Sequence, residues 1–130
     1  MNKIAQFHKV SFEQFEESWK DSFPGTSDEE IKAIYDGIKL PKRATRGSAG
    51  YDFFSPVDFT LKPGETIKIP TGIRVFIEED WVLNIFPRSG LGFKFRLQLN
   101  NTVGIIDSDY CPVCERTLTQ KYCRETCCTE

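Results

Sequence analysis

The stretch ETIKIPTGIRVFI, residues 65–77, decides the fold of this chain. It holds two short runs rich in isoleucine, valine and threonine, residue types that are enriched in β-strands. Thr71-Gly72 stands between the two runs, and KPGE at residues 62–65 leads into the first; both are typical of turns. The stretch therefore predicts short β-strands joined by tight turns.

The residues that follow continue the β pattern. WVLNIFP, residues 81–87, is again rich in β-branched and aromatic side chains. FRLQLN, residues 95–100, alternates with a period of two: Phe95, Leu97 and Leu99 fall on one face and polar residues on the other. Several short strands with turns between them predict a sandwich, a jelly roll or a barrel over residues 40–110.

Two amphipathic helices are predicted before this region, within residues 1–39. Four aromatic residues recur at helical spacing, and three isoleucines and a tyrosine then do the same: Phe12, Phe15, Trp19 and Phe23, followed by Ile31, Ile34, Tyr35 and Ile38. Ser11 with Gln14, and Ser27 with Glu30, have the spacing of helix N-terminal caps. We therefore expect a short N-terminal helical extension that packs on the β domain.

Residues 111–130 differ from the rest of the chain. They contain all five cysteines and none of the nine glycines, and they show no clear β alternation. The odd number of cysteines disfavours the closed disulfide set of a small secreted protein. The chain is accordingly divided into residues 1–39, residues 40–110 and a cysteine-rich tail at residues 111–130.

The composition excludes several classes of protein. A chain of 130 residues suits one domain, and 39% apolar residues with eleven phenylalanines can fill one core. The net charge of -2, without a strongly basic segment, speaks against a nucleic-acid partner. MNKIAQFHKV at the N-terminus has no long apolar run, so we expect no signal peptide, no membrane span and a cytoplasmic location.

Three stretches hold residues that packing alone would not select. GSAGYDFF places Asp52 among small and apolar residues, where a buried carboxylate needs a partner or a cation. PRSGLG combines Arg88, whose guanidinium suits phosphate, with Ser89 and with glycines whose amides can bind an anion. NNTVGIIDSDY places Asp107 after two isoleucines, with Tyr110 three residues further on. Taken singly, each stretch also fits an ordinary turn or hairpin.

Together and in this order, the three stretches resemble the first three motifs of the trimeric dUTP diphosphatases. The matching sequences are AGYDF at 49–53, PRSGLG at 87–92 and GIIDSDY at 104–110, with PKRAT at 41–45 and PTGI at 70–73 in support. The resemblance covers residues 38–110. It implies a mainly β, jelly-roll β-barrel, a homotrimer whose active sites are shared between chains, and hydrolysis of dUTP to dUMP and pyrophosphate with Mg²⁺.

The resemblance also implies a role for each matching residue. Asp107 is the general base that deprotonates the attacking water, and Tyr110 stacks on the deoxyribose. Asp52 holds water molecules of the Mg²⁺ shell. The residues expected to contact the substrate are Arg88, Ser89 and Gly90 for the phosphates, and Asn101, Gly104 and Ile106 for the uracil edge.

The resemblance stops after Tyr110, where the family continues with further strands and a glycine-rich C-terminal arm. Two interpretations of the tail stay open. A frameshift, a truncation or an assembly error would leave the barrel incomplete at its C-terminus, and the abrupt change of composition favours this. A genuine replacement would bind Zn²⁺ through four thiolates: Cys111, Cys114, Cys123 and Cys127.

Without closure over the nucleotide, weak or absent turnover is the expectation for this chain. Two alternatives to dUTP hydrolysis therefore stay open. One is a catalytically impaired nucleotide-binding or regulatory module with a zinc-binding tail, which would bind a dUTP analogue without turnover. The other is a relative of dCTP deaminase, which shares the fold and would release ammonia from dCTP. The aspartate and tyrosine of GIIDSDY favour the hydrolase.

Overall fold

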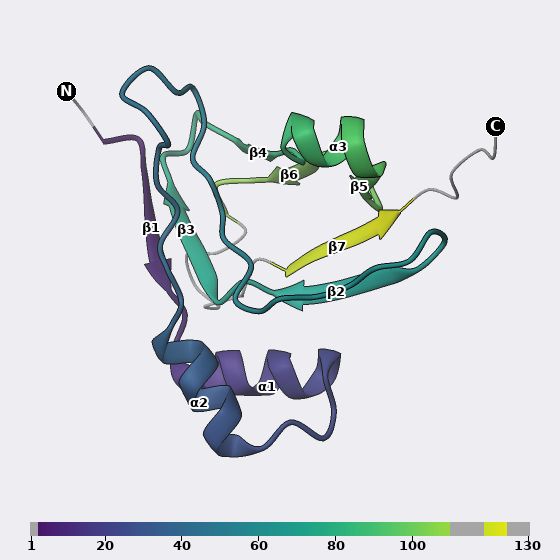
Figure 1. The fold of residues 1–130 in the computed structure, drawn as a ribbon. Helices are drawn as coiled ribbons and strands as arrows, with labels where there is room; N and C mark the ends of the chain where they lie inside the picture. Colours follow the sequence, from purple (N-terminus) through teal and green to yellow (C-terminus); the bar gives the residue numbers. More distant parts are fainter. Residues whose placement is uncertain (1–2, 110–118, 125–130) are drawn as a thin grey trace, which may run out of the picture.

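The computed structural model describes residues 3–109 in full and residues 119–124 as backbone (Figure 1). In this part of the chain the helices are α1 (Phe12–Ser22), α2 (Asp28–Asp36) and α3 (Ser89–Phe95). The strands are β1 (Ala5–Lys9), β2 (Thr66–Pro70), β3 (Ile73–Ile77), β4 (Leu83–Ile85), β5 (Leu97–Leu99), β6 (Gly104–Ile106) and β7 (Thr119–Arg124). The predicted mainly β class with helices near the N-terminus is confirmed. None of these helices is long and apolar enough to cross a membrane.

The described strands form three small antiparallel sheets. β1 pairs with β3, β4 pairs with β6, and β7 lies between β2 and β5. β1 and β7 have no counterpart in the sequence prediction, which expected helices near the N-terminus and no β pattern in the tail. Both strands are held by partners far away in the sequence, and such pairing is not visible in local residue patterns. Within the described residues the sheets do not close into one barrel, as expected for an incomplete one.

The strands and the turn predicted for residues 65–77 are confirmed as β2 and β3. Gly72 lies between them with a φ of 71°, in the left-handed region that favours glycine. The Gly72 carbonyl accepts the N–H of Val10 at 2.9 Å, which ties the turn to the segment before α1. Five residues of the two strands are buried: Ile69, Pro70, Ile73, Val75 and Ile77.

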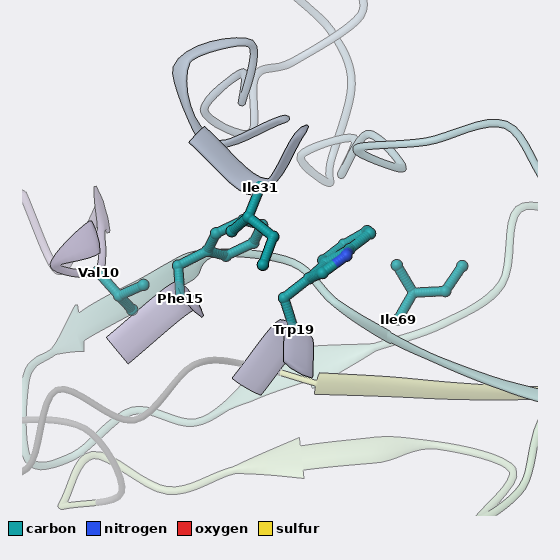
Figure 2. Packing of buried hydrophobic residues seen from close by; sticks show 5 residues of the cluster. All are labelled: Val10, Phe15, Trp19, Ile31 and Ile69. Carbon is teal, nitrogen blue, oxygen red and sulfur yellow. The ribbon is translucent and has the colours of Figure 1, made fainter. Parts of the chain in front are cut away.

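α1 packs on β2 and on α2, through the apolar faces that the sequence predicts. The buried cluster consists of Val10, Phe15, Trp19, Ile31 and Ile69 (Figure 2). The Tyr35 hydroxyl donates to the Val10 carbonyl at 2.7 Å, and the Lys9 ammonium donates to the Tyr35 carbonyl at 2.8 Å. The helix pair therefore shares one core with the β domain.

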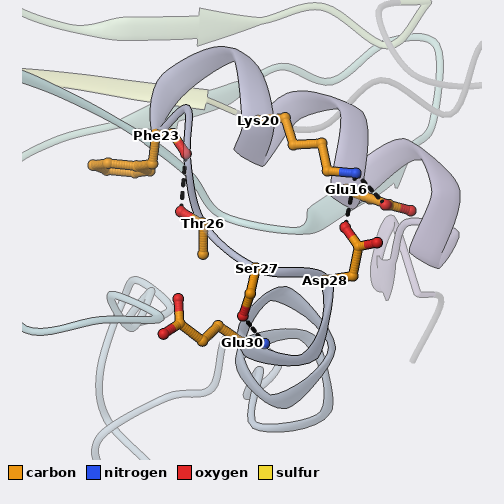
Figure 3. Close-up of polar contacts among 7 residues, drawn as sticks. All are labelled: Glu16, Lys20, Phe23, Thr26, Ser27, Asp28 and Glu30. Atoms are coloured by element: carbon orange, nitrogen blue, oxygen red, sulfur yellow. Dashed lines mark hydrogen bonds and ion pairs between the residues drawn. The ribbon is translucent and has the colours of Figure 1, made fainter.

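Side chains fix the connection between the two helices, as Figure 3 shows. Lys20 of α1 contacts Glu16 at 2.6 Å and Asp28 of α2 at 2.9 Å. The Ser27 hydroxyl accepts the N–H of Glu30 at 3.2 Å, which confirms the predicted cap of α2. The start of α2 is thus held both by a cap and by an ion pair to α1.

Replacing Ser27 with alanine is expected to lower the free energy of unfolding by about 1 kcal/mol. The substitution removes the hydroxyl oxygen that accepts the N–H of Glu30 at the start of α2. The measurement is the urea midpoint of the purified variant. Ser27→Asp, which keeps an acceptor at the cap, should retain the midpoint of the native chain. A Ser27→Ala variant as stable as the native chain would show that the cap contributes nothing.

The PRSGLGFK segment begins a helix and is not the turn that the sequence predicts. α3 starts at Ser89 after the N-cap Arg88, whose carbonyl accepts the N–H groups of Leu91 and Gly92 at 3.0 and 3.2 Å. These local hydrogen bonds hold a helical turn despite the two glycines. The second stretch is therefore a helix start attached to the end of β4.

The strand predicted at residues 95–100 is shorter than expected. Phe95 is the last residue of α3, and Arg96 caps the helix in the left-handed region with a φ of 53°. The alternation holds only from Leu97 to Leu99, both of which are buried. The prediction that Phe95 lies on one strand face with Leu97 and Leu99 is wrong, because Phe95 belongs to α3 and is 51% exposed.

Candidate active site

The loop before the first stretch is braced by its own side chains. The Ser48 hydroxyl accepts the N–H of Thr45 at 3.0 Å, and the Ser48 carbonyl accepts Nε of Arg43 at 2.8 Å. Next to this turn, the N–H of Asp52 donates to the Lys42 carbonyl at 2.8 Å, and the N–H of Lys42 donates back at 3.3 Å. Residues paired in this way carry their side chains on the same face. The side chains of Lys42 and Asp52 therefore emerge beside each other.

Lys42 is not among the residues that the sequence predicts for the site. Its pairing with Asp52 depends on how the loop between them folds, and residue patterns do not reveal this. The one signal in the sequence is that a basic residue precedes, and Asp52 follows, the same short loop that contains glycine and serine. The structure thus adds a cation to the first stretch.

Asp52 and Arg88 join the first stretch to the second. Nη1 of Arg88 donates to Oδ2 of Asp52 at 2.8 Å. The Asp52 side chain is 27% exposed, whereas that of Arg88 is 70% exposed. An ion pair with one partner largely in solvent contributes little to stability. Arg88 is therefore held beside the carboxylate but can turn toward a ligand at small cost.

The three residues expected to contact phosphate lie together at the start of α3. Arg88 is the N-cap and makes no side-chain capping bond. A Cβ added at Gly90 would meet nothing within 4 Å, so the backbone is open on that side. The first N–H groups of a helix have no acceptor within the helix. Ser89 and Gly90 thus present open backbone next to a guanidinium.

The third stretch runs from the turn after β5 along β6. Asn101 is exposed in this turn, where its carbonyl accepts the N–H of Val103 at 2.7 Å. Gly104 pairs with Ile85 of β4, and a Cβ added at Gly104 would come within 3.2 Å of the Ile85 Cβ. Contact with β4 therefore already explains this glycine. The Ile106 side chain is half-buried and packs against the buried residues Val75 and Ile77 of β3.

Asp107 lies apart from Arg88 within one chain. Asp107 is exposed and directly follows β6, next to the start of β4, because Ile106 pairs with Leu83. Arg88 lies beyond the other end of β4, after Ile85. At about 3.3 Å per residue, the first and last residues of this three-residue strand are roughly 7 Å apart. Within one chain, the expected base and the expected phosphate contacts are therefore attached to opposite ends of the β4–β6 pair.

Several predicted site residues lie outside the described part of the chain. They are Tyr110, Cys111, Cys114 and Cys127, while Cys123 is described only as backbone within β7. The zinc set therefore stays a prediction. Among the described residues there is no group of three or more side chains that could hold a metal ion.

Asp52 is the carboxylate that the resemblance assigns to Mg²⁺. Its Oδ2 contacts Arg88, and no cluster of further metal ligands accompanies it in the described residues. Protein sites for Mg²⁺ in nucleotide enzymes combine one or two carboxylates with substrate phosphates and water. The donor set therefore fits a Mg²⁺ ion that arrives with a triphosphate, and it does not fit an ion held by the protein alone.

A hollow of about 850 Å³ lies beside the loop between β3 and β4. Its lining includes Phe76, Glu78 and Trp81, together with Ser108 and Asp109 that follow Asp107. Neither Asp52 nor Arg88 lines it. The hollow is therefore not the place where the first two stretches meet.

Solved structures of dUTPases have the same fold. The match to a dUTPase from Streptococcus mutans covers 89% of this chain and 77% of the S. mutans chain, with a TM-score of 0.58 and 29% identity. The match to a mutant dUTPase from phage phi11 of S. aureus covers 96% of this chain and 61% of the phage chain, with a TM-score of 0.63 and 24% identity. That phage enzyme coordinates a structural Mg(II) ion.

Curated relatives and a family model agree with this likeness. Deoxyuridine 5'-triphosphate nucleotidohydrolase of Alcanivorax borkumensis is 50% identical over 78 residues, 58% of this chain and 52% of that protein. The enzyme of the same name from Idiomarina loihiensis is 47% identical over 88 residues, 62% of this chain and 58% of that protein. The chain thus spans only about half the length of these relatives. The dUTPase family model matches residues 36–123, and so reaches further into the tail than the motif resemblance. The chain belongs to the dUTPase family.

Proposed function

We propose that this chain hydrolyses dUTP to dUMP and pyrophosphate. The observation that carries the proposal is the 2.8 Å ion pair between Asp52 and Arg88, which joins two of the motif-bearing stretches in a chain of this family. A guanidinium, open amides and a single carboxylate suit a triphosphate that carries Mg²⁺. Catalysis by such a site is mainly positioning and charge neutralisation.

The residues at the start of α3 would bind the phosphate chain. Arg88 would leave Asp52 and donate to phosphate oxygens, and the Ser89 hydroxyl and Gly90 amide would add neutral donors. Asp52 would then be free to hold water molecules of a Mg²⁺ shell. The ion would offset the negative charge of the triphosphate.

The residues along β6 would bind the nucleoside and carry out proton transfer. The backbone from Asn101 to Ile106, with Gly104, would read the uracil edge. Asp107 would accept the proton of the water that attacks the α-phosphorus, a role that suits an exposed carboxylate close to the backbone that reads the base. Tyr110 would stack on the deoxyribose.

We further propose that the active site forms between chains of a homotrimer. Asp107 and Arg88 lie at opposite ends of the β4–β6 pair, and in such a trimer one chain would supply Asp107 while a second would supply Arg88. Large apolar side chains on or beside β4, α3 and β6 are exposed, as is typical of surfaces that other chains cover: Val82, Phe86, Leu91, Phe93, Phe95 and Ile105.

Replacing Ile105 with lysine is expected to reduce the mass in solution from three chains to one. Ile105 is 64% exposed in the middle of β6, opposite Asn84, so a lysine there can reach solvent without disturbing the single chain. A charge buried between chains is strongly unfavourable. Light scattering after size exclusion measures the mass, and Ala33→Lys on the exposed side of α2 is the control. A native chain that is monomeric would contradict the trimer.

The test of the function is pyrophosphate release from dUTP in the presence of Mg²⁺, beside the same assay with UTP and dCTP. Release from dUTP alone would support the proposal. Binding of a non-hydrolysable dUTP analogue without any turnover would instead support the impaired nucleotide-binding module. Ammonia released from dCTP would support the relation to the deaminases.

A further inference from the structure

We propose that Lys42 is a further phosphate-binding residue of this site and that it favours a triphosphate over a monophosphate. This inference rests on the proposed function, because it takes Arg88 and Asp52 as the phosphate end of the site. It adds a residue outside the three motif stretches, placed by the fold of the loop at residues 42–52.

The backbone places Lys42 against the centre of this site. Lys42 and Asp52 exchange two hydrogen bonds, at 2.8 and 3.3 Å, which directs both side chains to one face. Asp52 in turn contacts Arg88 at 2.8 Å. Two cationic residues from distant parts of the chain therefore contact Asp52, Lys42 through its backbone and Arg88 through its side chain, and the three side chains together carry a net positive charge.

The Lys42 ammonium is available to a ligand. Among the described residues it takes part in no ion pair, and it lies 5.9 Å from the centroid of the Phe54 ring. A cation at this distance, over a ring that is 38% exposed, is held only weakly. Asp52 is meanwhile occupied by Arg88. Of the two cations beside Asp52, Lys42 is therefore the one that makes no ion pair among the described residues. An anion can bind its ammonium without breaking a strong contact.

The chemistry of lysine explains why the length of the phosphate chain matters. Arg88 presents a planar fork that binds one phosphate group, whereas an ammonium on a flexible stem is a compact charge that can follow a longer anion. The backbone bridge places Lys42 beside Asp52, so this cation belongs to a different segment from Arg88. A monophosphate bound to Arg88 has no further phosphate group to offer Lys42, whereas a triphosphate does.

Lys39 offers a matched control. Its ammonium lies 5.8 Å from the same Phe54 ring, so its removal costs the same charge and nearly the same ring contact. Lys39 is not paired with Asp52. Any difference between Lys42→Gln and Lys39→Gln therefore reports the position beside the carboxylate and not the net charge of the surface.

The experiment is calorimetric titration of the native chain, Lys42→Gln and Lys39→Gln with three ligands in Mg²⁺ buffer: dUMP, a non-hydrolysable dUTP analogue and inorganic tripolyphosphate. Lys42→Gln should weaken binding of the analogue and of tripolyphosphate about tenfold, the effect of one lost charge-assisted contact. Binding of dUMP should change less than about twofold, and Lys39→Gln should leave all three ligands nearly unchanged. Thermal melting checks that each variant is folded.

Each outcome decides the proposal. Equal losses in Lys42→Gln and Lys39→Gln, or equal losses for dUMP and the analogue, would overturn it while the proposed function stands. The chain could instead bind tripolyphosphate in a way that depends on Lys42, with no gain in affinity from the uracil nucleoside. That result would support the role of Lys42 and contradict the proposed function. A folded native chain that binds none of the ligands would overturn both.

Discussion

Replacing Asp107 with alanine is expected to reduce pyrophosphate release from dUTP by about 10²–10⁴-fold, the contribution typical of a positioned general base. Asp107 is exposed directly after β6, so its removal should not disturb the core. The rate is measured on the purified chain with Mg²⁺, and the urea midpoint should stay unchanged. A variant that keeps the native rate would remove Asp107 from the mechanism.

Asp109 provides the matched control for this variant. It is also exposed, lies two residues further on and borders the hollow beside β3. Asp109→Ala removes the same charge from the same turn, so it separates proton transfer from a change in the local field. We expect the Asp109→Ala rate to stay within a few-fold of the native rate. Equal losses in both variants would contradict the assignment of the base.

The separation of Asp107 from Arg88 allows a second control. If the site forms between chains, unfolding and refolding Asp107→Ala together with Arg88→Ala gives assemblies in which some sites combine an intact base with an intact arginine. Turnover should then reappear from two impaired variants. If each chain carried a complete site, the mixture would stay as inactive as its parts.

Much of the fold follows from local sequence patterns, and the exceptions have physical causes. α1, α2, β2 and β3 were predictable because their apolar residues recur at the spacing of the element that buries them. α3 contradicts expectation because glycine costs about 1 kcal/mol in a helix relative to alanine, which makes PRSGLGFK read as a turn. β1 depends on β3, whose paired residues lie 64 to 72 positions away, and β7 depends on β2 and β5, whose paired residues lie 23 to 57 positions away.

The candidate site also has a part that local sequence patterns predict and a part that they do not. Asp52, Arg88 and Asp107 stand out in the sequence because their chemistry does not suit simple packing, and the structure joins the first two. That Asp107 lies elsewhere depends on the register of β4 and β6, which no residue pattern reveals. Lys42 became a candidate only through its backbone pairing with Asp52. Contacts made by backbone across loops are thus the part of the site that the sequence conceals.

Replacing Gly72 with alanine is expected to lower the free energy of unfolding by about 2–5 kcal/mol. A left-handed backbone costs alanine about 1–2 kcal/mol, and Gly72 has a φ of 71°. The added Cβ would also overlap Cδ1 of Ile38 and lie 3.1 Å from Cδ2 of the fully buried Phe15, and overpacking of this kind costs about 1–3 kcal/mol more. Urea denaturation measures the change, which is a large part of the total for a small domain.

Two further variants separate the causes of this loss. Gly25 has a φ of 93° and open space around the position of a Cβ, so Gly25→Ala should cost only the backbone strain of about 1–2 kcal/mol. Ile38→Val removes the methyl that a new Cβ would meet, and it should therefore cost less in the Gly72→Ala chain than in the native chain. Simple additivity of the two changes would mean that the overlap is relieved by movement of Ile38. The helix pair would then rest loosely on the β2–β3 turn, whereas coupling would show that the turn and the helices pack as one unit.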